Sequence, residues 1–256
     1  AGTLLTPADV KAAKKAGATF GVSPGATDSL LKACEDEGLP LLPGAVTATE
    51  IMTLLERGYT VLTVDAMRGL KSDCGSPSKL SNGQLVKDAL DAVAHLASLP
   101  GVDSQRISVI GFSKGAMIAS WLASSSVANA VRPQTPPVAA SISAYAFCAL
   151  APNRGRPQGI SIVQPDTDRP LLVLMGGKDN ETPPASCLDL LPQLQAAGKP
   201  VQWHLYPDAT HSWDSADKDG YSKIDFKGHR VTYTYDPVVT EDSRKRVFDF
   251  LANPRK

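Results

Sequence analysis

A serine at position 113 lies in a sequence that favours nucleophilic chemistry. The apolar run Ile107–Ile110 leads into Gly-Phe-Ser-Lys-Gly (111–115) and then into a helix predicted over 116–124. A tight strand-to-helix turn of this kind lifts the serine hydroxyl above the sheet, and the small glycines on both sides are expected to make the turn possible. The following helix points its positive N-terminal end at developing negative charge. An ordinary turn is the alternative, because the pattern also occurs by chance.

The serine needs partners, because a hydroxyl is too weak an acid to attack a carbonyl unless an imidazole takes its proton. Asp179 follows the strand predicted over 170–175, and His211 follows the strand predicted over 201–206. Both lie past the carboxyl end of a strand, where open parallel sheets place their sites. The chain order serine, aspartate, histidine is the one that α/β-hydrolase architecture imposes.

Alternatives exist for each member of this set. Asp179 could cap the helix that follows it, since aspartate is common in turns, and Asp208 is a rival partner for His211. The other histidines are expected to pack or to be solvated: His95 in a helix, His204 in a strand and His229 in a loop. Cys148 is a weak rival nucleophile and is interpreted as a buried thiol at an apolar strand end.

The composition excludes several classes of function. Lysine plus arginine equal aspartate plus glutamate at 26 each, so the net charge of zero gives no basic footprint for nucleic acid. No apolar run is long enough to span a bilayer, and no charged-then-apolar leader is expected. The cysteines lack metal-ligand spacing, and we expect reduced thiols in a cytoplasmic protein. They are Cys34, Cys74, Cys148 and Cys187.

Residues 1–58 contain three short strand–turn–helix units. Their strands are expected over 2–5, 18–23 and 39–44, and their helices begin near Thr6, Asp28 and Thr47. In the first unit, Thr6 is a capping residue with proline at the first helical position and an acid at the third. Gly17, Gly38 and Gly58 are expected to end the three helices. Repeated units of this kind build parallel sheets or barrels.

The remainder of the chain alternates strands and helices in the same way. A buried strand is expected over 58–65, followed by a long amphipathic helix from Asn82 to Leu99. After the segment around Ser113, further elements are expected: strand 138–147, strand 170–175, helix 185–197, strand 201–206, a hairpin or loop near 227–229, and a closing helix over 240–251.

Several motifs in the first segment are specific to one family. They are Gly2-Thr3-Leu4-Leu5-Thr6-Pro7, Ser23-Pro24-Gly25, Leu39-Pro40-Leu41-Leu42-Pro43-Gly44, Glu50-Ile51-Met52 and Gly58-Tyr59. On these residues the segment resembles 2-keto-3-deoxy-6-phosphogluconate aldolase, a (β/α)₈ barrel family that uses a Schiff-base lysine. The family's lysine strand reads Thr60–Asp65 here and has no lysine, and the family's glutamate would lie before Ala1. We therefore expect a scaffold without aldolase activity.

From Tyr59 onward a second resemblance covers nearly all of residues 59–256. Its motifs are the strand 58–65, the serine turn 111–115, the loop Gly176–Pro184 and the loop Pro207–Asp214. These resemble the dienelactone hydrolase family of α/β-hydrolases. The resemblance implies Ser113 as nucleophile, His211 as base and Asp179 as its orienting acid. Dienelactone hydrolases proper have cysteine at the nucleophile position, so the serine favours a broader esterase.

An oxyanion formed on the substrate needs two backbone N–H donors. The residue after the nucleophile, Lys114, should supply one. In the hydrolase family the second precedes the helix that leads to the strand after Tyr59. The corresponding loop here is 43–46, which belongs to the aldolase-like part and makes Ala45 the candidate.

The two resemblances meet near Gly58, which suggests an engineered chimera or an unusual recombination. We expect one continuous α/β domain, 1–58 and 59–256, with a mainly parallel sheet flanked by helices on both faces and a (βα)₃ segment of barrel type at its start. Because the hydrolase part supplies more strands, it should dictate strand order. The strands 18–23 and 39–43 should then not lie side by side, because the strand at 106–111 occupies that position.

The leading functional hypothesis is hydrolysis of a small ester or lactone through an acyl-enzyme. It implies a small-molecule substrate, no metal or organic cofactor, no nucleic-acid or membrane partner, and a monomer or small homo-oligomer. The second hypothesis is a folded chimera that keeps the catalytic residues but has little or no turnover. A phosphosugar-binding or carbonyl-lyase module is a weaker third, resting on 23–25 and 43–44 alone.

Overall fold

The chain folds as two compact units, Ala1–Lys79 and Leu80–Lys256. The computed structural model describes residues 4, 6–18, 21–23, 28–39, 41–43, 54–64, 81–152, 157–225 and 228–254. The first unit has a core of its own around Val10 and Leu39, and the second has separate cores around its sheet. Each unit thus buries apolar side chains of its own.

The first unit contains α1 (Pro7–Lys15), β1 (Gly21–Ser23), α2 (Asp28–Asp36) and β2 (Leu41–Pro43). The predicted start of α1 is confirmed: Asp9 N–H donates to Thr6 Oγ1 at 3.3 Å, and Thr6 N–H donates to Asp9 Oδ2 at 2.8 Å. Gly17 and Gly38 follow the two helices with φ of 87° and 56°, a conformation that glycine adopts without strain. Most of the predicted helix from Thr47 and of the strand 2–5 lies outside the described residues.

The expected separation of the first strands is wrong. β1 and β2 pair in parallel, Gly21 opposite Leu41 and Ser23 opposite Pro43, as a two-stranded sheet. Neither belongs to the sheet that contains the strand before Ser113. The physical reason is connectivity: strands joined by one short helix pair with each other at little cost in chain entropy, whichever part of the chain supplies more strands.

The buried strand expected over 58–65 is also not observed. Tyr59–Val64 is irregular chain without strand pairing, and Val64 is 47% exposed. An apolar β-branched run has the propensity for a strand but forms one only when a neighbouring strand pairs with it.

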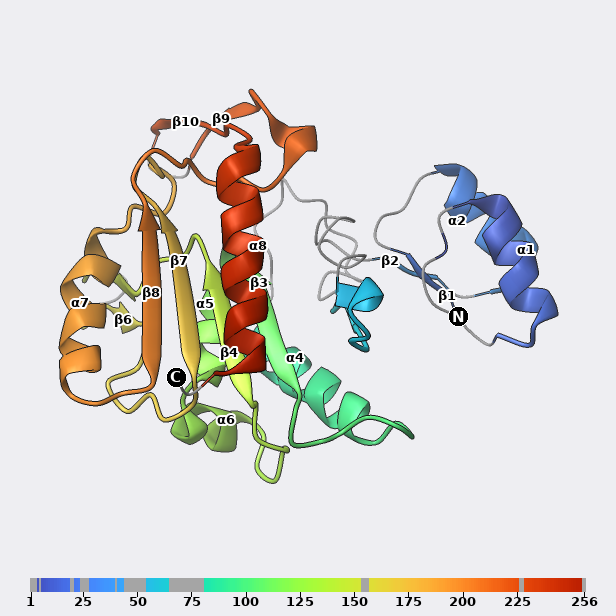
Figure 1. The fold of residues 1–256 in the computed structure, drawn as a ribbon, viewed down its shortest axis with the longest axis horizontal. Helices are drawn as coiled ribbons and strands as arrows, with labels where there is room; N and C mark the ends of the chain where they lie inside the picture. Colours follow the sequence, from blue (N-terminus) through green and yellow to red (C-terminus); the bar gives the residue numbers. More distant parts are fainter. Residues whose placement is uncertain are drawn as a thin grey trace. The chain divides into compact units, whose positions relative to one another are not determined.

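The second unit is built on a parallel sheet of four described strands (Figure 1). They are β3 (Ser108–Phe112), β4 (Ala140–Ala144), β7 (Leu171–Gly176) and β8 (Val201–Tyr206), in the spatial order β3-β4-β7-β8. All neighbouring pairs are parallel, so the carboxyl ends of the strands share one edge. The predicted parallel sheet is confirmed.

The remaining elements of this unit connect and cover these strands. The helices are α4 (Asn82–Ala97), α5 (Lys114–Leu122), α6 (Ser125–Val131), α7 (Ala185–Ala196) and α8 (Pro237–Ala252), with a 3₁₀ turn at Ala216–Lys218. Two small antiparallel hairpins pair β5 (Ala149–Leu150) with β6 (Ile160–Ser161) and β9 (Ser222–Ile224) with β10 (Arg230–Thr232).

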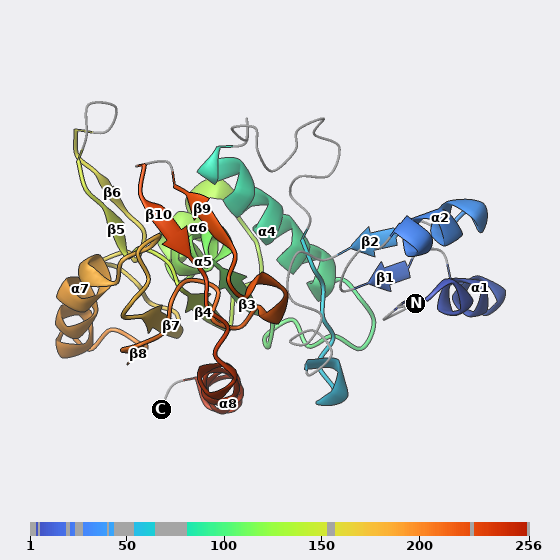
Figure 2. The same cartoon turned by 90° about the horizontal axis from the view of Figure 1, so that it is seen from above.

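Alternation along the strands buries both faces of the sheet. In β7, Leu172 and Leu174 pack in the core that includes Phe250 of α8, whereas Leu171 and Val173 pack in the core that includes α7. A third core joins α4 and α5 to the start of β3. Figure 2 shows α8 on one face of the sheet and α4 and α5 on the other. The second unit is therefore a three-layer α/β structure, as predicted.

The expectation of reduced cysteines is wrong for two of them. Cys148, just before β5, and Cys187, in α7, form a disulfide with a Cα–Cα distance of 4.8 Å. Cys148 is thereby excluded as a rival nucleophile, while Cys34 is a free, buried cysteine. The sequence separation of 39 residues carried no sign of the pairing, because only the packing of α7 against β5 brings the two sulfurs together.

This disulfide gives a test of stability. Replacing both cysteines (Cys148→Ala with Cys187→Ala) should lower the free energy of unfolding by about 2–4 kcal/mol, because the bridge restricts a loop of the unfolded chain. Urea unfolding of the wild type and the double variant, with and without dithiothreitol, measures the difference. The reductant should destabilise the wild type and leave the double variant unchanged; equal sensitivity of the two proteins would contradict the bridge.

Candidate active site

Ser113 occupies the turn between β3 and α5. Its backbone has φ 51° and ψ −115°, a strained conformation for a residue with a side chain. The backbone N–H of Ser113 donates to Ala144 O at 3.0 Å, and its carbonyl accepts from Ala116 N–H at 3.0 Å. Among the described residues the hydroxyl makes no capping bond to α5, so the turn points the side chain away from the helix it precedes.

The two glycines beside Ser113 differ in what they require. A Cβ on Gly111 would lie 2.0 Å from Gly115 O, so the turn closes only with glycine at 111. No described heavy atom lies within 4 Å of a Cβ built on Gly115. The expectation that both flanking positions need a small residue holds for Gly111 alone.

Gly111→Ala should therefore destabilise the protein by about 3 kcal/mol, the upper range for overpacking against atoms that cannot move aside. Gly115→Ala is the matched control, and it should be neutral or stabilising by up to about 1 kcal/mol because alanine favours the helix. Thermal unfolding of both variants measures the contrast, and equal losses would contradict the geometry of the turn.

The loops after β7 and β8 lie against each other. Gly177 N–H donates to Tyr206 O at 2.8 Å, and Lys178 N–H donates to Ala209 O at 3.0 Å. Side chains at Gly176 and Gly177 would clash, with Cβ positions 2.5 Å from Ala209 O and 2.3 Å from Pro207 O. This close backbone approach brings Asp179, at the end of one loop, to His211, at the end of the other.

The structure brings Ser113, His211 and Asp179 together in one hydrogen-bonded chain. His211 Nε2 lies 2.9 Å from Ser113 Oγ, and His211 Nδ1 lies 2.8 Å from Asp179 Oδ2. His211 and Asp179 are buried, and Ser113 is half-buried. A carboxylate only accepts hydrogen bonds, so His211 Nδ1 carries the proton in the neutral ring and Nε2 is left to accept from the Ser113 hydroxyl.

Asp179 is surrounded by donors. Its Oδ1 accepts from Glu181 N–H at 2.9 Å and from Thr182 N–H at 2.8 Å, and its Oδ2 accepts from the Thr182 hydroxyl at 2.7 Å. Burial raises the pKa of the Asp179 carboxyl, but hydrogen bonds from His211 and Thr182 outweigh burial and hold this pKa below its usual value. The group is therefore an anion at neutral pH, able to orient the imidazole.

The alternatives weighed from the sequence lie elsewhere. Asp208 pairs with Lys178 at 2.8 Å, and its side chain is 81% exposed. His204 packs edge-on against Tyr206 with ring centroids 4.6 Å apart, while His95 and His229 are exposed. The three other histidines thus pack or are exposed, as expected from the sequence.

The structure describes one of the two predicted oxyanion donors, Lys114. Lys114 is the first residue of α5, where backbone N–H groups have no carbonyl within the helix to bind. Ala45, the predicted second donor, lies outside the described residues.

Sequence reasoning missed several residues around His211. The ring of Tyr145 meets the imidazole edge-on at 4.7 Å, and its hydroxyl donates to Asp214 Oδ1 at 3.0 Å. Thr182 braces Asp179, and the carboxylate of Glu181 lies 3.9 Å from His211 Nε2. Proximity to Asp179 in the chain was the only available signal for Glu181 and Thr182; none existed for Tyr145.

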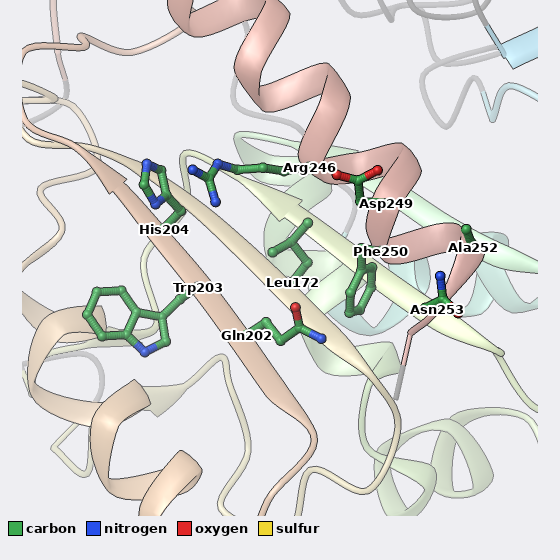
Figure 3. A pocket seen from close by; sticks show the side chains of 9 residues that line it. All are labelled: Leu172, Gln202, Trp203, His204, Arg246, Asp249, Phe250, Ala252 and Asn253. Atoms are coloured by element: carbon green, nitrogen blue, oxygen red, sulfur yellow. The ribbon is translucent and has the colours of Figure 1, made fainter. Parts of the chain in front are cut away.

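A separate cavity of about 380 Å³ lies between the sheet and α8, and Ser113, Asp179 and His211 do not line it (Figure 3). Figure 3 shows Arg246 reaching from α8 toward His204 of β8. Arg246 Nε donates to Asp242 at 2.6 Å, and the same carboxylate accepts from the Tyr206 hydroxyl at 2.8 Å. Asp249, the acid among the lining residues, pairs with Lys245, and the residues that line this cavity include no serine or cysteine.

In the part of the chain that the structure describes, three or more histidine, cysteine, aspartate or glutamate side chains nowhere gather as metal ligands. None of the described helices is both long and apolar enough to cross a membrane.

A parallel sheet that places a serine, a histidine and an aspartate at one edge defines a protein of the α/β-hydrolase class. Residues 52–254 match the family model described as the dienelactone hydrolase family, and the chain belongs to that family. Residues 1–66 match the model described as KDPG and KHG aldolase. The two matches are consistent with a fusion of two segments, as the sequence resemblances predicted.

Individual relatives carry both names. The chain is 52% identical over 59 residues to "2-dehydro-3-deoxy-phosphogluconate aldolase" of Pseudomonas aeruginosa, covering 23% of this chain and 27% of the relative. It is 28% identical over 153 residues to "Putative carboxymethylenebutenolidase" of Salmonella typhimurium, covering 60% and 53%. The chain thus spans about half the length of that curated hydrolase relative.

A solved structure shares the fold. The crystal structure described as "Putative Dienelactone Hydrolase" from Klebsiella pneumoniae superposes with a TM-score of 0.50 at 24% identity, covering 68% of this chain and 63% of that one. At this identity the likeness concerns the fold of the second unit, a central parallel sheet flanked by helices.

Proposed function

We propose that this protein hydrolyses small esters or lactones through an acyl-enzyme formed on Ser113. The observation that carries the proposal is the chain of hydrogen bonds in which His211 Nε2 lies 2.9 Å from Ser113 Oγ and His211 Nδ1 lies 2.8 Å from Asp179 Oδ2. Membership of the dienelactone hydrolase family supports the same class of substrate.

In the first half-reaction Ser113 Oγ attacks the carbonyl carbon while its proton passes to His211 Nε2. Asp179 stabilises the resulting imidazolium, to which its carboxylate is already hydrogen-bonded. The oxyanion accepts a hydrogen bond from the backbone N–H of Lys114. Collapse of the intermediate breaks the bond to the alcohol oxygen, which takes the proton from His211 and leaves.

In the second half-reaction a water gives its proton to His211 Nε2 and its oxygen attacks the acyl carbon. Collapse breaks the bond to Ser113 Oγ, which recovers its proton from His211, and the carboxylic acid is released. Every proton taken by the imidazole is returned within the same half-reaction, so no cofactor is required.

The test combines turnover with covalent labelling. The protein should hydrolyse p-nitrophenyl acetate, and a fluorophosphonate should inactivate it while adding one phosphonyl group to the tryptic peptide 107–114. Fragmentation of that peptide should place the group on Ser113 rather than Ser108. A protein that is neither labelled nor active would favour the alternative, a folded fusion of aldolase and hydrolase fragments without turnover.

A further inference from the structure

A second carboxylate lies on the reactive side of His211. Glu181 Oε2 is 3.9 Å from His211 Nε2, the nitrogen that also lies 2.9 Å from Ser113 Oγ. Asp179, in contrast, binds the other ring nitrogen. The two acids of one loop therefore flank the imidazole, one on each nitrogen.

Glu181 is fixed in place by residues of the β9–β10 hairpin. The Tyr233 hydroxyl donates to Glu181 Oε2 at 2.5 Å, and Lys223 Nζ donates to Glu181 Oε1 at 2.8 Å. Lys223 also lies over the ring of Tyr233, 5.5 Å from its centroid. Figure 1 shows this hairpin at the carboxyl ends of β7 and β8.

The hairpin residues keep their protons. Burial and the hydrogen bond to Glu181 raise the pKa of Tyr233 to about 12, so its hydroxyl remains a donor at neutral pH. Burial lowers the pKa of Lys223, but its bonds to Glu181 and Tyr233 outweigh burial and raise it above the ordinary value. The Glu181 side chain is only 17% exposed. Its carboxylate is therefore a fixed hydrogen-bond acceptor on the same side of His211 as Ser113.

The distance from Glu181 Oε2 to His211 Nε2 fits a bridging water. At 3.9 Å the two groups are too far apart for a direct hydrogen bond, but one water molecule can bridge them by hydrogen bonding to both. Such a water would donate one hydrogen to His211 Nε2 and the other to Glu181 Oε2. Its oxygen lone pairs would remain available beside Ser113, where the acyl group is attached.

We propose that Glu181 positions the hydrolytic water of the second half-reaction against His211 Nε2. This inference rests on the proposed function and adds a residue to it. The water's first proton goes to His211 Nε2, its oxygen bonds to the acyl carbon, and the second hydrogen stays bonded to oxygen in the released acid while Glu181 remains an acceptor throughout. The first half-reaction needs no water and so no contribution from Glu181.

The groups that face His211 make this assignment specific. Asp179 holds Nδ1, and the rings of Tyr145 and Tyr233 pack at 4.7 and 5.4 Å from the imidazole. Lys223 contacts Glu181 and the ring of Tyr233, and Asp214 accepts from the Tyr145 hydroxyl. Among these described groups, Glu181 supplies the carboxylate on the Nε2 side.

The experiment separates the two half-reactions in the Glu181→Gln variant. Fluorophosphonate labelling of Ser113 reports the first, because it uses the serine and His211 without water. The turnover number for p-nitrophenyl acetate reports the whole cycle. We expect the labelling rate to stay within about threefold of wild type while turnover falls about 10- to 100-fold, as misplacing one reactant does. Acetyl-enzyme should then accumulate, and mass spectrometry should show an increase of about 42 Da, the mass that one acetyl group adds.

Further variants exclude a merely structural role. Tyr233→Phe and Lys223→Met loosen the carboxylate without removing it, and each should lower turnover less than Glu181→Gln. Glu241→Gln, an exposed glutamate on α8, is the matched control and should leave both rates unchanged.

Two results would overturn the inference and leave the proposed function intact. One is unchanged turnover in Glu181→Gln; the other is an equal fall in labelling and turnover, which would place Glu181 in the support of His211 itself. If the wild-type protein is neither labelled nor active, the proposed function itself fails, and the two failures are thus distinguishable.

Discussion

Ser113→Ala is expected to reduce hydrolysis of p-nitrophenyl acetate by about 10⁴-fold or more. Without the hydroxyl no acyl-enzyme forms, and only the weaker contributions of substrate binding and the oxyanion donors remain. The fold should tolerate the change, because Ser113 Oγ bonds to His211 and not to the helix that it precedes. Steady-state kinetics with thermal unfolding on the same preparations measures both effects.

The control for this variant is Ser98→Ala, at the exposed end of α4. It removes a hydroxyl of the same kind from a position outside the site and should leave turnover unchanged. Equal background rates for the wild type and Ser113→Ala would show that the serine is not the nucleophile, and the enzymatic hypothesis would fail with it.

Asp179→Asn is expected to lower turnover by about 10⁴-fold at neutral pH while leaving the site nearly in place. The amide is the same size as the carboxylate, but it can donate to His211 Nδ1 and so favours the tautomer with the proton on Nε2. That tautomer cannot accept the proton of Ser113. The imidazolium also loses the anion that lies 2.8 Å from it.

Asp208→Asn is the matched control, because Asp208 was the rival partner for His211 in the sequence. Its carboxylate pairs with Lys178 at an exposed position, where ion pairs contribute at most about 1 kcal/mol. We expect wild-type turnover in this variant. A large loss in Asp208→Asn together with a small one in Asp179→Asn would reverse the assignment of the acid.

The sequence predicted the elements around Ser113, Asp179 and His211 well, because these elements follow local rules. The serine turn is recognisable from a strand, two glycines and a helix, and the strands before Asp179 and His211 are apolar runs of the right length. The structure places these elements within a few residues of the predictions. Periodicity and capping depend on neighbouring residues, so a single sequence contains the information.

Some predictions failed where distant residues decide the outcome. The pairing of β1 with β2, the absence of a strand at Tyr59–Val64, and the disulfide between Cys148 and Cys187 each depend on which segments meet in space. Propensity cannot specify a neighbour. Strand pairing is settled by connections and packing, and two sulfurs bond only if the backbone brings them within reach.

The candidate site divides in the same way. The sequence by itself determined which serine, aspartate and histidine could act and in what order they occur along the chain. Only the tertiary structure decided that Asp179, rather than Asp208, meets His211, and that Glu181 faces the imidazole from the side of Ser113. The reason is physical: the loops after β7 and β8 bond to each other through backbone atoms, and the β9–β10 hairpin adds Tyr233 and Lys223 from far along the chain. Contacts of that range leave no local pattern in the sequence.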